Sequence, residues 1–216
     1  MKLEISKAGS MLSLLMLTAC GGGIVKDIPQ NPDTSSKYIF YLHGSAEESE
    51  GHTSKYQASI NAISTGSTTV ISEVRRDTDP NTYAKKINQQ VNTLISKGVP
   101  AKNITVSGFS KGAIIAIAVS TVINNPEVNY VLLAGCSDSL NEKYGVHPHL
   151  AVGRILSIYD VDDVKFGSCS GFINHSDKVT FKEIELYTGK GHKLFRIPKE
   201  KFIKEWRDPL LEWAGA

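Results

Sequence analysis

The serine in residues 108–112, GFSKG, is the residue whose surroundings most favour chemistry. It stands in a Gly-X-Ser-X-Gly pattern between a short β-prone run, Ile104–Ser107, and a strongly apolar helical stretch, Ala113–Ile123. A sharp turn from strand to helix lifts a serine hydroxyl above the sheet, and glycines flank it because side chains would collide with neighbouring backbone. The pattern predicts that Ser110 is a nucleophile; the alternative is an ordinary Gly-Ser turn.

A serine nucleophile needs a base, and the best placed histidine is His192 in the glycine-rich loop of residues 188–192, TGKGH. Neutral imidazole accepts the serine proton because its pKa lies near neutrality. His175 is the alternative base. Three other histidines are interpreted as residues of solvated loops: His52, His147 and His149. A metal site at residues 147–149 is not expected, because no further cluster of Cys, His or carboxylate ligands accompanies these two histidines.

Three carboxylates follow the β-prone run Ile155–Tyr159 and are candidates for the acid that orients the histidine: Asp160, Asp162 and Asp163. Such an acid holds the imidazole in one tautomer and stabilises the imidazolium without itself being protonated. The residues alone leave the choice among the three open.

The elements expected to position these side chains alternate between β-prone runs and amphipathic or apolar helices. The other predicted strands are Tyr38–Leu42, Thr68–Val74, Tyr130–Ala134 and Val179–Leu186, and the other predicted helices are Asn81–Lys97 and Phe202–Trp213, the latter kinked by Pro209. This alternation predicts an α/β fold, a mostly parallel sheet with helices on both faces. Ligands bind such sheets at the carboxyl ends of the strands.

With these motifs in this order, the chain resembles the α/β-hydrolases over residues 37–216, starting at the family's third strand. The resemblance implies an oxyanion-binding loop at residues 43–45, HGS, with backbone N–H groups of Ser45 (or Ala46) and Lys111 as donors. It also favours Asp163 over Asp160 and Asp162 as the acid. The intervals between Ser110, Asp163 and His192 leave no room for an inserted cap domain, which argues against a lidded lipase.

The N-terminus predicts export. Lys2 and Lys7 precede an apolar run, Met11–Leu17, that is too short to span a bilayer. Residues 17–20, LTAC, resemble the lipobox of bacterial lipoproteins, which implies a signal peptide over residues 1–19, a lipidated Cys20 and an anchor at the periplasmic face of the outer membrane. The alternative is an apolar helix docked on the domain. Residues 20–36 are expected to be a flexible tether.

Export would place Cys136 and Cys169 in an oxidising compartment, where they can form a disulfide; the alternative is two free buried thiols. Nucleic acid is not an expected partner, because the net charge of +2 over 216 residues comes without a concentrated basic face. The charged residues 75–79, RRDTD, are interpreted as a solvated loop, and Trp206 and Trp213 as core residues.

The leading hypothesis is therefore a serine hydrolase that cleaves a small or medium carboxylic ester or thioester through an acyl-enzyme, without a cofactor. A catalytically inactive hydrolase-fold binding protein at the cell envelope is the alternative from another class. A peptidase or acyltransferase would use the same residues. The pocket walls are expected from two loops, residues 46–59 and 137–153, and neither the substrate nor the oligomeric state can be read from them.

Overall fold

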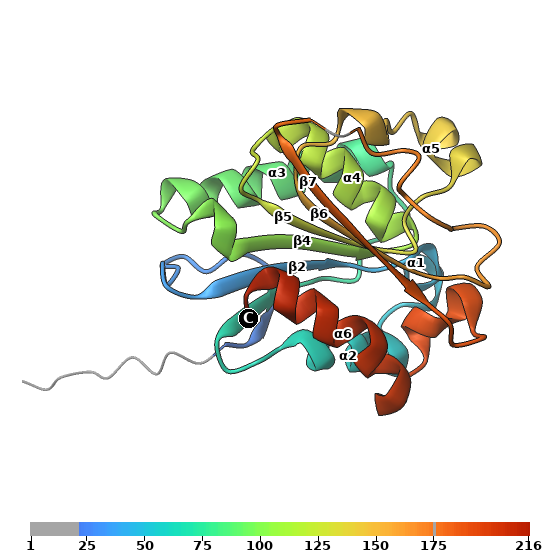
Figure 1. The fold of residues 1–216 in the computed structure, drawn as a ribbon. Coiled ribbons are helices and arrows are strands. Elements are labelled where there is room, and N and C mark those ends of the chain that lie inside the picture. The colour runs from blue at the N-terminus through green and yellow to red at the C-terminus, as the bar shows by residue number, and fades with distance from the viewer. Residues whose placement is uncertain (1–21, 175) are drawn as a thin grey trace, which may run out of the picture.

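The computed structural model describes residues 22–174 and 176–216, and within them seven strands form one parallel sheet (Figure 1). The order of the strands across the sheet is β1-β3-β2-β4-β5-β6-β7. Their bounds are β1 Ile24–Val25, β2 Lys37–Leu42, β3 Thr68–Ile71, β4 Ile104–Phe109, β5 Asn129–Leu133, β6 Gly153–Asp160 and β7 Val179–Leu186. Every neighbouring pair is parallel, so the carboxyl ends of all strands lie at one edge.

Helices cover both faces of this sheet. Helices α3 and α4 lie on one face, and α2 and α6 lie on the other (Figure 1). The α-helices are α1 Ser45–Glu50, α2 Ser54–Ile63, α3 Pro80–Ser96, α4 Lys111–Ile123, α5 Asp138–Tyr144 and α6 Glu200–Ala214, and the 3-10 helices are η1 Ala101–Asn103, η2 Pro148–Leu150 and η3 Gly191–Arg196. The prediction of a mostly parallel sheet between two helical layers, without a cap domain, is confirmed.

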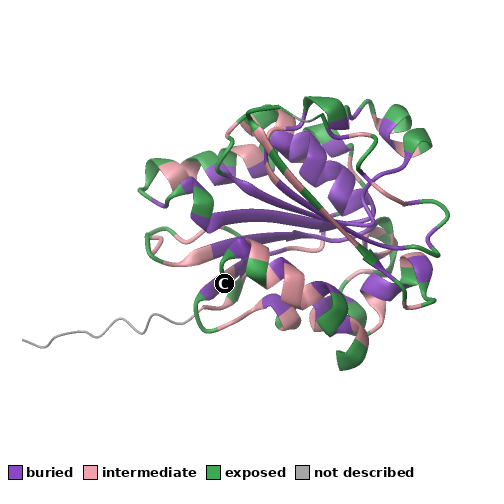
Figure 2. Cartoon of the chain, viewed as in Figure 1, coloured by how far each residue is buried: buried purple, intermediate pink, exposed green. Residues whose placement is uncertain are grey.

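The core sits on the central strands and on α4. All residues of β4 and β5 are buried, as is α4 from Lys111 to Ser120 (Figure 2). Strands buried on both faces read as continuous apolar runs, which is the pattern these segments have. Full burial of each Ile or Leu side chain contributes about 1.5–3 kcal/mol, so this layer fixes the strand from which Ser110 emerges.

Helix α3 shows how local signals set the helical layer. Its buried apolar residues recur at spacings of three and four: Pro80, Ala84, Ile87, Val91 and Leu94. The Asp79 carboxylate caps the helix by accepting a hydrogen bond from the Thr82 N–H at 2.8 Å, and Pro80 occupies the first turn. Gly98, with φ +91°, follows its end.

Three segments differ from expectation. Part of the predicted tether is a strand: β1 pairs with β3, with Ile24 opposite Val70, and the Gly22 N–H donates to the Gly66 carbonyl at 2.9 Å. Residues 46–59, expected as a loop, contain most of α1 and the first half of α2, and α5 occupies part of 137–153.

The signal peptide and Cys20 lie outside the described residues. In the part of the chain that is described, no helix has the length and apolar character needed to cross a bilayer.

Candidate active site

Ser110 occupies a strained turn between β4 and α4. Its backbone has φ 55° and ψ −120°, a conformation that non-glycine residues rarely adopt and that costs about 1–3 kcal/mol. A Cβ on Gly108 would lie 2.1 Å from the Gly112 carbonyl oxygen, and a Cβ on Gly112 would lie 1.9 Å from the Leu42 carbonyl oxygen. Both glycines are therefore required, because the turn packs backbone directly against backbone.

The structure brings Ser110, His192 and Asp163 together at the carboxyl edge of the sheet. His192 Nε2 lies 3.0 Å from the Ser110 Oγ, and His192 Nδ1 lies 2.7 Å from an Asp163 carboxylate oxygen. An ionised carboxylate only accepts hydrogen bonds, so this pairing assigns the ring proton to Nδ1 and leaves Nε2 free to accept the serine proton. Of the three candidate acids, Asp163 is the one that contacts the histidine.

The surroundings of Asp163 and His192 fix both side chains. The second oxygen of Asp163 accepts hydrogen bonds from the Lys165 N–H at 3.1 Å and the Phe166 N–H at 3.0 Å. The Phe166 ring stacks on the imidazole with centroids 4.4 Å apart, and the Phe109 ring packs against it at 4.8 Å. The Asp163 side chain is 2% exposed and that of His192 33%, so only the histidine reaches solvent.

Asp160 is buried at the end of β6 and holds the loop that precedes His192. Its carboxylate accepts hydrogen bonds from the N–H and hydroxyl of Thr188 and from the Gly191 N–H, at 3.0, 2.5 and 3.1 Å. Burial opposes its ionisation, but these bonds and one from the Asp162 N–H outweigh burial and lower the pKa of Asp160. Asp162 itself is exposed.

The loop after β2 lies against the nucleophile turn. A Cβ on Gly44 would lie 3.1 Å from the Phe109 ring and 3.5 Å from the Ser110 Cβ. Helix α1 begins at Ser45 after the N-cap Gly44, which has no side chain, and α4 begins at Lys111 after the N-cap Ser110, whose hydroxyl makes no capping hydrogen bond within the described residues. The first N–H groups of both helices therefore stay available to a ligand at Ser110.

His43 belongs to this loop but is unsuited to be a base. Its Nε2 accepts a hydrogen bond from the Arg75 N–H at 2.8 Å, and its Nδ1 lies 2.7 Å from the Gly44 carbonyl oxygen, to which it donates. Burial, together with the charge of Arg75, lowers the pKa of His43 to about 4. The ring is neutral at physiological pH and serves to hold the loop.

A buried network of charged side chains ties α1 to the nucleophile turn. Glu48 pairs with Arg75 at 3.0 Å and with Lys111 at 2.9 Å, and Lys111 also pairs with Asp77 at 2.6 Å. Burial opposes the charge of Lys111, but its bonds to Asp77 and Glu48 outweigh this and raise its pKa. The interpretation of residues 75–79 as a solvated loop is therefore wrong for Arg75, whose side chain is 3% exposed.

The neighbouring glutamate ties α1 to the histidine segment. The Glu47 carboxylate accepts a hydrogen bond from Arg196 Nε at 2.9 Å, and Arg196 belongs to η3, the helix that contains His192. Glu50 pairs with the same guanidinium at 2.9 Å. Two consecutive glutamates thus link the Ser45 end of the loop to both Lys111 and the His192 segment. These two glutamates were not expected in the site, because residues 46–59 were predicted to be a loop.

Cys136 and Cys169 form a disulfide in the structure, with Cα atoms 5.2 Å apart. Cys136 follows β5, and Cys169 lies in the segment after Asp163, so the bond ties that segment to the sheet.

His147 and His149 lie near each other, with ring centroids 5.6 Å apart, but the described residues hold no group of three His, Cys, Asp or Glu that could bind a metal. His52 packs edge-on against Tyr56, and His175 lies outside the described residues.

Solved structures with a similar fold are distant in sequence. A lipase-esterase related protein from Clostridium acetobutylicum superposes with a TM-score of 0.56 at 13% identity, covering 84% of this chain and 96% of that chain. Est1E from Butyrivibrio proteoclasticus gives 0.55 at 13% identity, covering 88% and 93%. The RedJ thioesterase of the prodiginine pathway in Streptomyces coelicolor gives 0.54 at 10% identity, covering 83% and 93%. These likenesses show the fold.

No curated protein sequence matches the chain significantly. The profile of the phospholipase/carboxylesterase family matches residues 67–184, which is more than half of the 216-residue chain and includes the turn at Ser110 and the carboxylate of Asp163. The protein therefore belongs to the phospholipase/carboxylesterase family of α/β-hydrolases.

Proposed function

We propose that this protein is a serine hydrolase that cleaves small or medium carboxylic esters or thioesters through an acyl-enzyme on Ser110. The observation that carries the proposal is the continuous line of hydrogen bonds from the Ser110 hydroxyl through His192 to Asp163, at 3.0 and 2.7 Å. Family membership supports hydrolysis of an ester bond, and the geometry supports a serine mechanism.

In the proposed reaction His192 Nε2 takes the hydroxyl proton as the Ser110 Oγ bonds to the substrate carbonyl carbon. The imidazolium then gives that proton to the leaving oxygen or sulfur, and the acyl group stays on the serine. Water attacks the acyl-enzyme by the same route, which releases the acid and restores the hydroxyl. Asp163 remains ionised throughout and stabilises the imidazolium.

The carbonyl oxygen becomes negative in the tetrahedral intermediate and needs donors on the side away from His192. We assign this role to the backbone N–H of Lys111 and that of Ser45, or of Ala46 next to it. One such donor contributes about 3–4 kcal/mol to stabilising the transition state. The close approach of Gly44 to the nucleophile turn, where an added Cβ would lie 3.5 Å from the Ser110 Cβ, supports this assignment.

Labelling by a fluorescent fluorophosphonate tests the nucleophile directly, because this reagent bonds covalently to an activated serine. We expect the wild-type protein to be labelled and Ser110→Ala to remain unlabelled, with the far-UV circular dichroism of the variant unchanged. Equal labelling of both proteins, or of neither, would reject Ser110 as the nucleophile. A folded but unlabelled wild type that still binds esters would favour the catalytically inactive binding protein.

An assay panel separates the remaining activities. The proposed enzyme turns over p-nitrophenyl esters and matched thioesters, whereas a peptidase would cleave peptide amides and an acyltransferase would require an added acceptor alcohol or amine. Short and medium acyl chains are favoured because, among the described residues, only α5 and η2 lie between β5 and β6 and no helix or strand lies between β6 and β7, so no inserted cap domain is seen to enclose a long chain.

We also propose that residues 1–19 are a signal peptide and that a lipid on Cys20 anchors the enzyme at the periplasmic face of the outer membrane. The basic start, the short apolar run and the LTAC lipobox support this proposal.

A further inference from the structure

A basic cavity lies beside the segment that carries His192. Its volume is about 530 Å³. We call it the basic cavity and define it by its four cationic lining residues, Lys55, Lys190, Lys193 and Arg196. Lys55 belongs to the first turn of α2, and the other three surround or belong to η3. Both elements lie on the side of the sheet that α2 and α6 cover (Figure 1).

The charges around this cavity do not cancel. Arg196 is held by Glu47 and Glu50, each at 2.9 Å, and no carboxylate is among the lining side chains. In the described part of the chain the ammonium groups of Lys55 and Lys193 have no hydrogen-bond or ion-pair partner, whereas Lys190 Nζ lies 5.7 Å from the Phe202 ring centroid. The Asp162 carboxylate lies 3.9 Å from where a Cβ on Gly189 would stand, so four cations face three carboxylates and one positive charge is left in excess.

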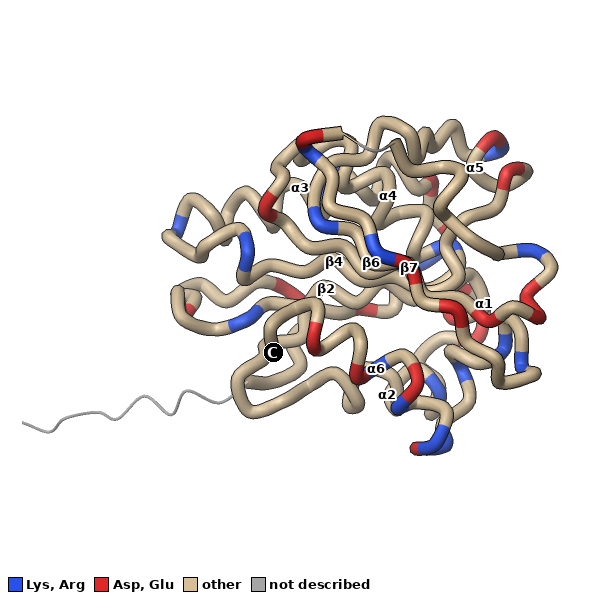
Figure 3. The backbone as a smooth tube through the Cα atoms, in the orientation of Figure 1, with Lys and Arg blue, Asp and Glu red and all other residues tan. Residues whose placement is uncertain are grey.

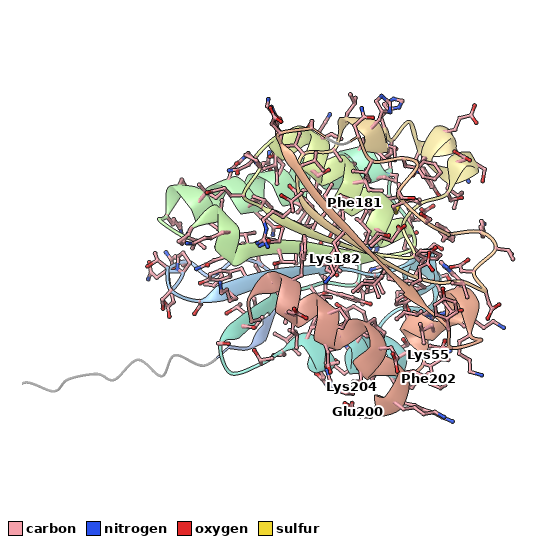
Figure 4. The ribbon with its side chains drawn as sticks, viewed as in Figure 1. Lys55, Phe181, Lys182, Glu200, Phe202 and Lys204 are labelled. Carbon is pink, nitrogen blue, oxygen red and sulfur yellow. A yellow bond between two sulfur atoms is a disulfide. The ribbon has the colours of Figure 1, made fainter. Side chains whose placement is uncertain are left out.

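The figures show where these cations lie. Several lysines and arginines appear on the tube at the lower right, between α1 and the start of α6, with aspartates and glutamates among them (Figure 3). Lys55 and Phe202 both lie below the sheet in the same region (Figure 4). Lysines that project into a cavity without a carboxylate partner are suited to a phosphate or a carboxylate, which ammonium groups bind as point charges.

The position of the cavity relative to His192 indicates which part of a substrate would reach it. Gly189, Lys190 and Lys193 line the cavity, and His192 lies between the last two in the chain. In the proposed mechanism His192 protonates the leaving group, so the leaving group lies on the histidine side of Ser110. Ser110, Asp163 and His192 are not among the residues that line the cavity, so a substrate would reach these lysines only through a group that extends past His192, and the alcohol or thiol part is the part on that side.

We propose that the basic cavity binds a phosphate or carboxylate group and that this group belongs to the leaving alcohol or thiol of the substrate. The second half of this proposal rests on the proposed hydrolase function, whereas anion binding itself does not. The exposed lysines act additively and each exposed ion pair contributes little, so removal of two should weaken anion binding about fivefold.

Anion binding is tested with inorganic phosphate and the Ser110→Ala protein, observed by NMR of 15N-labelled backbone at constant ionic strength set with chloride. We expect saturable shifts in residues 189–197, weakened about fivefold in Lys55→Gln/Lys193→Gln. The matched control is Lys85→Gln/Lys102→Gln. It removes the same charge from α3 and η1, which do not line the cavity. No saturable shift, or equal weakening in both double variants, would overturn the cavity as an anion site.

The source of the anion is tested with 4-acetoxybenzoate and its neutral methyl ester, which share the acetyl group and differ in a carboxylate on the leaving phenol. We expect Lys55→Gln/Lys193→Gln to raise KM about fivefold for the anionic ester and to leave KM for the neutral ester unchanged. The control variant should change KM for neither ester. Phosphate binding with equal KM effects on both esters would make the ligand a separate anion and overturn the substrate assignment. Phosphate binding with no turnover of either ester would reject the hydrolase and retain the cavity.

Discussion

Asp160 ends β6 and Asp163 follows it three residues later; both are buried, yet their hydrogen-bond partners give them different roles. Asp163 has one oxygen on His192 and the other on two backbone N–H groups of its own loop. The Asp160 carboxylate accepts hydrogen bonds from backbone N–H and hydroxyl groups of the segment that leads to His192, and it does not contact the imidazole ring. We therefore interpret Asp163 as the acid of the reaction and Asp160 as a positioning residue.

Replacing Asp163 by Asn is predicted to lower kcat for an activated ester by about three to four orders of magnitude, because the amide favours the wrong imidazole tautomer. The fold should survive, since the amide oxygen can still accept the bonds from Lys165 and Phe166. Steady-state kinetics with p-nitrophenyl acetate measures the loss. The exposed Asp162→Asn is the matched control, and a comparable loss there would contradict the assignment of the acid.

Replacing Asp160 by Asn is predicted to cost stability in a pH-dependent way. The Asn amide can accept only some of the hydrogen bonds that the carboxylate accepts, and its NH₂ group would face backbone N–H donors. We expect this to lower the free energy of unfolding by about 1–3 kcal/mol at neutral pH. The pKa of Asp160 is lowered in the folded protein, so its contribution is present above the usual carboxyl pKa and is lost as the pH falls through the lowered value.

Thermal unfolding of wild type and Asp160→Asn between pH 7 and pH 3 checks this sign. The difference in Tm should be largest at pH 7 and should narrow toward pH 3. A positioning role further requires kcat to fall with Asp160→Asn at 25 °C, where both proteins are folded, while KM changes little. A difference in Tm that widens in acid would contradict the hydrogen-bond account.

At the scale of elements, α1 is short but is held from two sides. Its six residues could not form a stable helix alone, because helices this short are marginal in water. Glu48 holds it to Arg75 and Lys111, and Glu47 holds it to Arg196. The helix begins at Ser45, so these buried pairs also fix the N–H group that we assign to the oxyanion.

Replacing Glu48 by Gln is predicted to destabilise the protein by about 3 kcal/mol, because the buried Arg75 loses its carboxylate partner and Lys111 keeps only Asp77. We expect kcat to fall at least tenfold, with KM changed less, since the oxyanion donors act mainly in the transition state. Glu50→Gln is the matched control, because Glu50 is 45% exposed and its partner Arg196 retains Glu47. Equal effects of the two changes on kcat would contradict the role of the network.

The sequence was sufficient to predict elements with long periodic or continuous apolar patterns. The runs that became β2, β4 and α4 were found nearly whole, since they are buried on all sides. Helix α1 was missed because SAEESE contains no apolar stripe, and its stability comes from distant cations. Strand β1 was missed because two residues carry no period.

The same limit applies to the site. Ser110 and His192 could be predicted because glycines and flanking elements mark them locally. Asp160 and Asp163 could not be separated on the residues alone, because their tasks depend on a bond from a loop far along the chain. The stacking of Phe166 on the imidazole had no signal in the sequence, since it arises from the path of the loop after Asp163.

At the scale of the molecule, the direction of the strands sets how an anchored enzyme would face its surroundings. All strands are parallel, so Ser110 follows the carboxyl end of β4, whereas Ile24 begins β1 near the opposite edge of the sheet (Figure 1). The four steps from Cys20 to Ile24 span at most about 14 Å even when fully extended. A lipid on Cys20 would therefore hold the domain close to the bilayer with the catalytic edge turned away.

Replacing Cys20 by Ser is predicted to move the protein from the membrane fraction to the soluble periplasmic fraction of a Gram-negative host, because the protein loses the acyl chains that would anchor it. Since the catalytic edge of an enzyme anchored through Cys20 would face away from the bilayer, anchored and released enzyme should have equal kcat/KM toward a water-soluble ester. Fractionation with immunoblotting measures the first expectation, and assays of washed vesicles against the released protein measure the second. A Cys20→Ser protein that stays with the membrane would point instead to an apolar N-terminal helix. Lower activity of the anchored form, restored by detergent, would mean that the catalytic edge faces the bilayer.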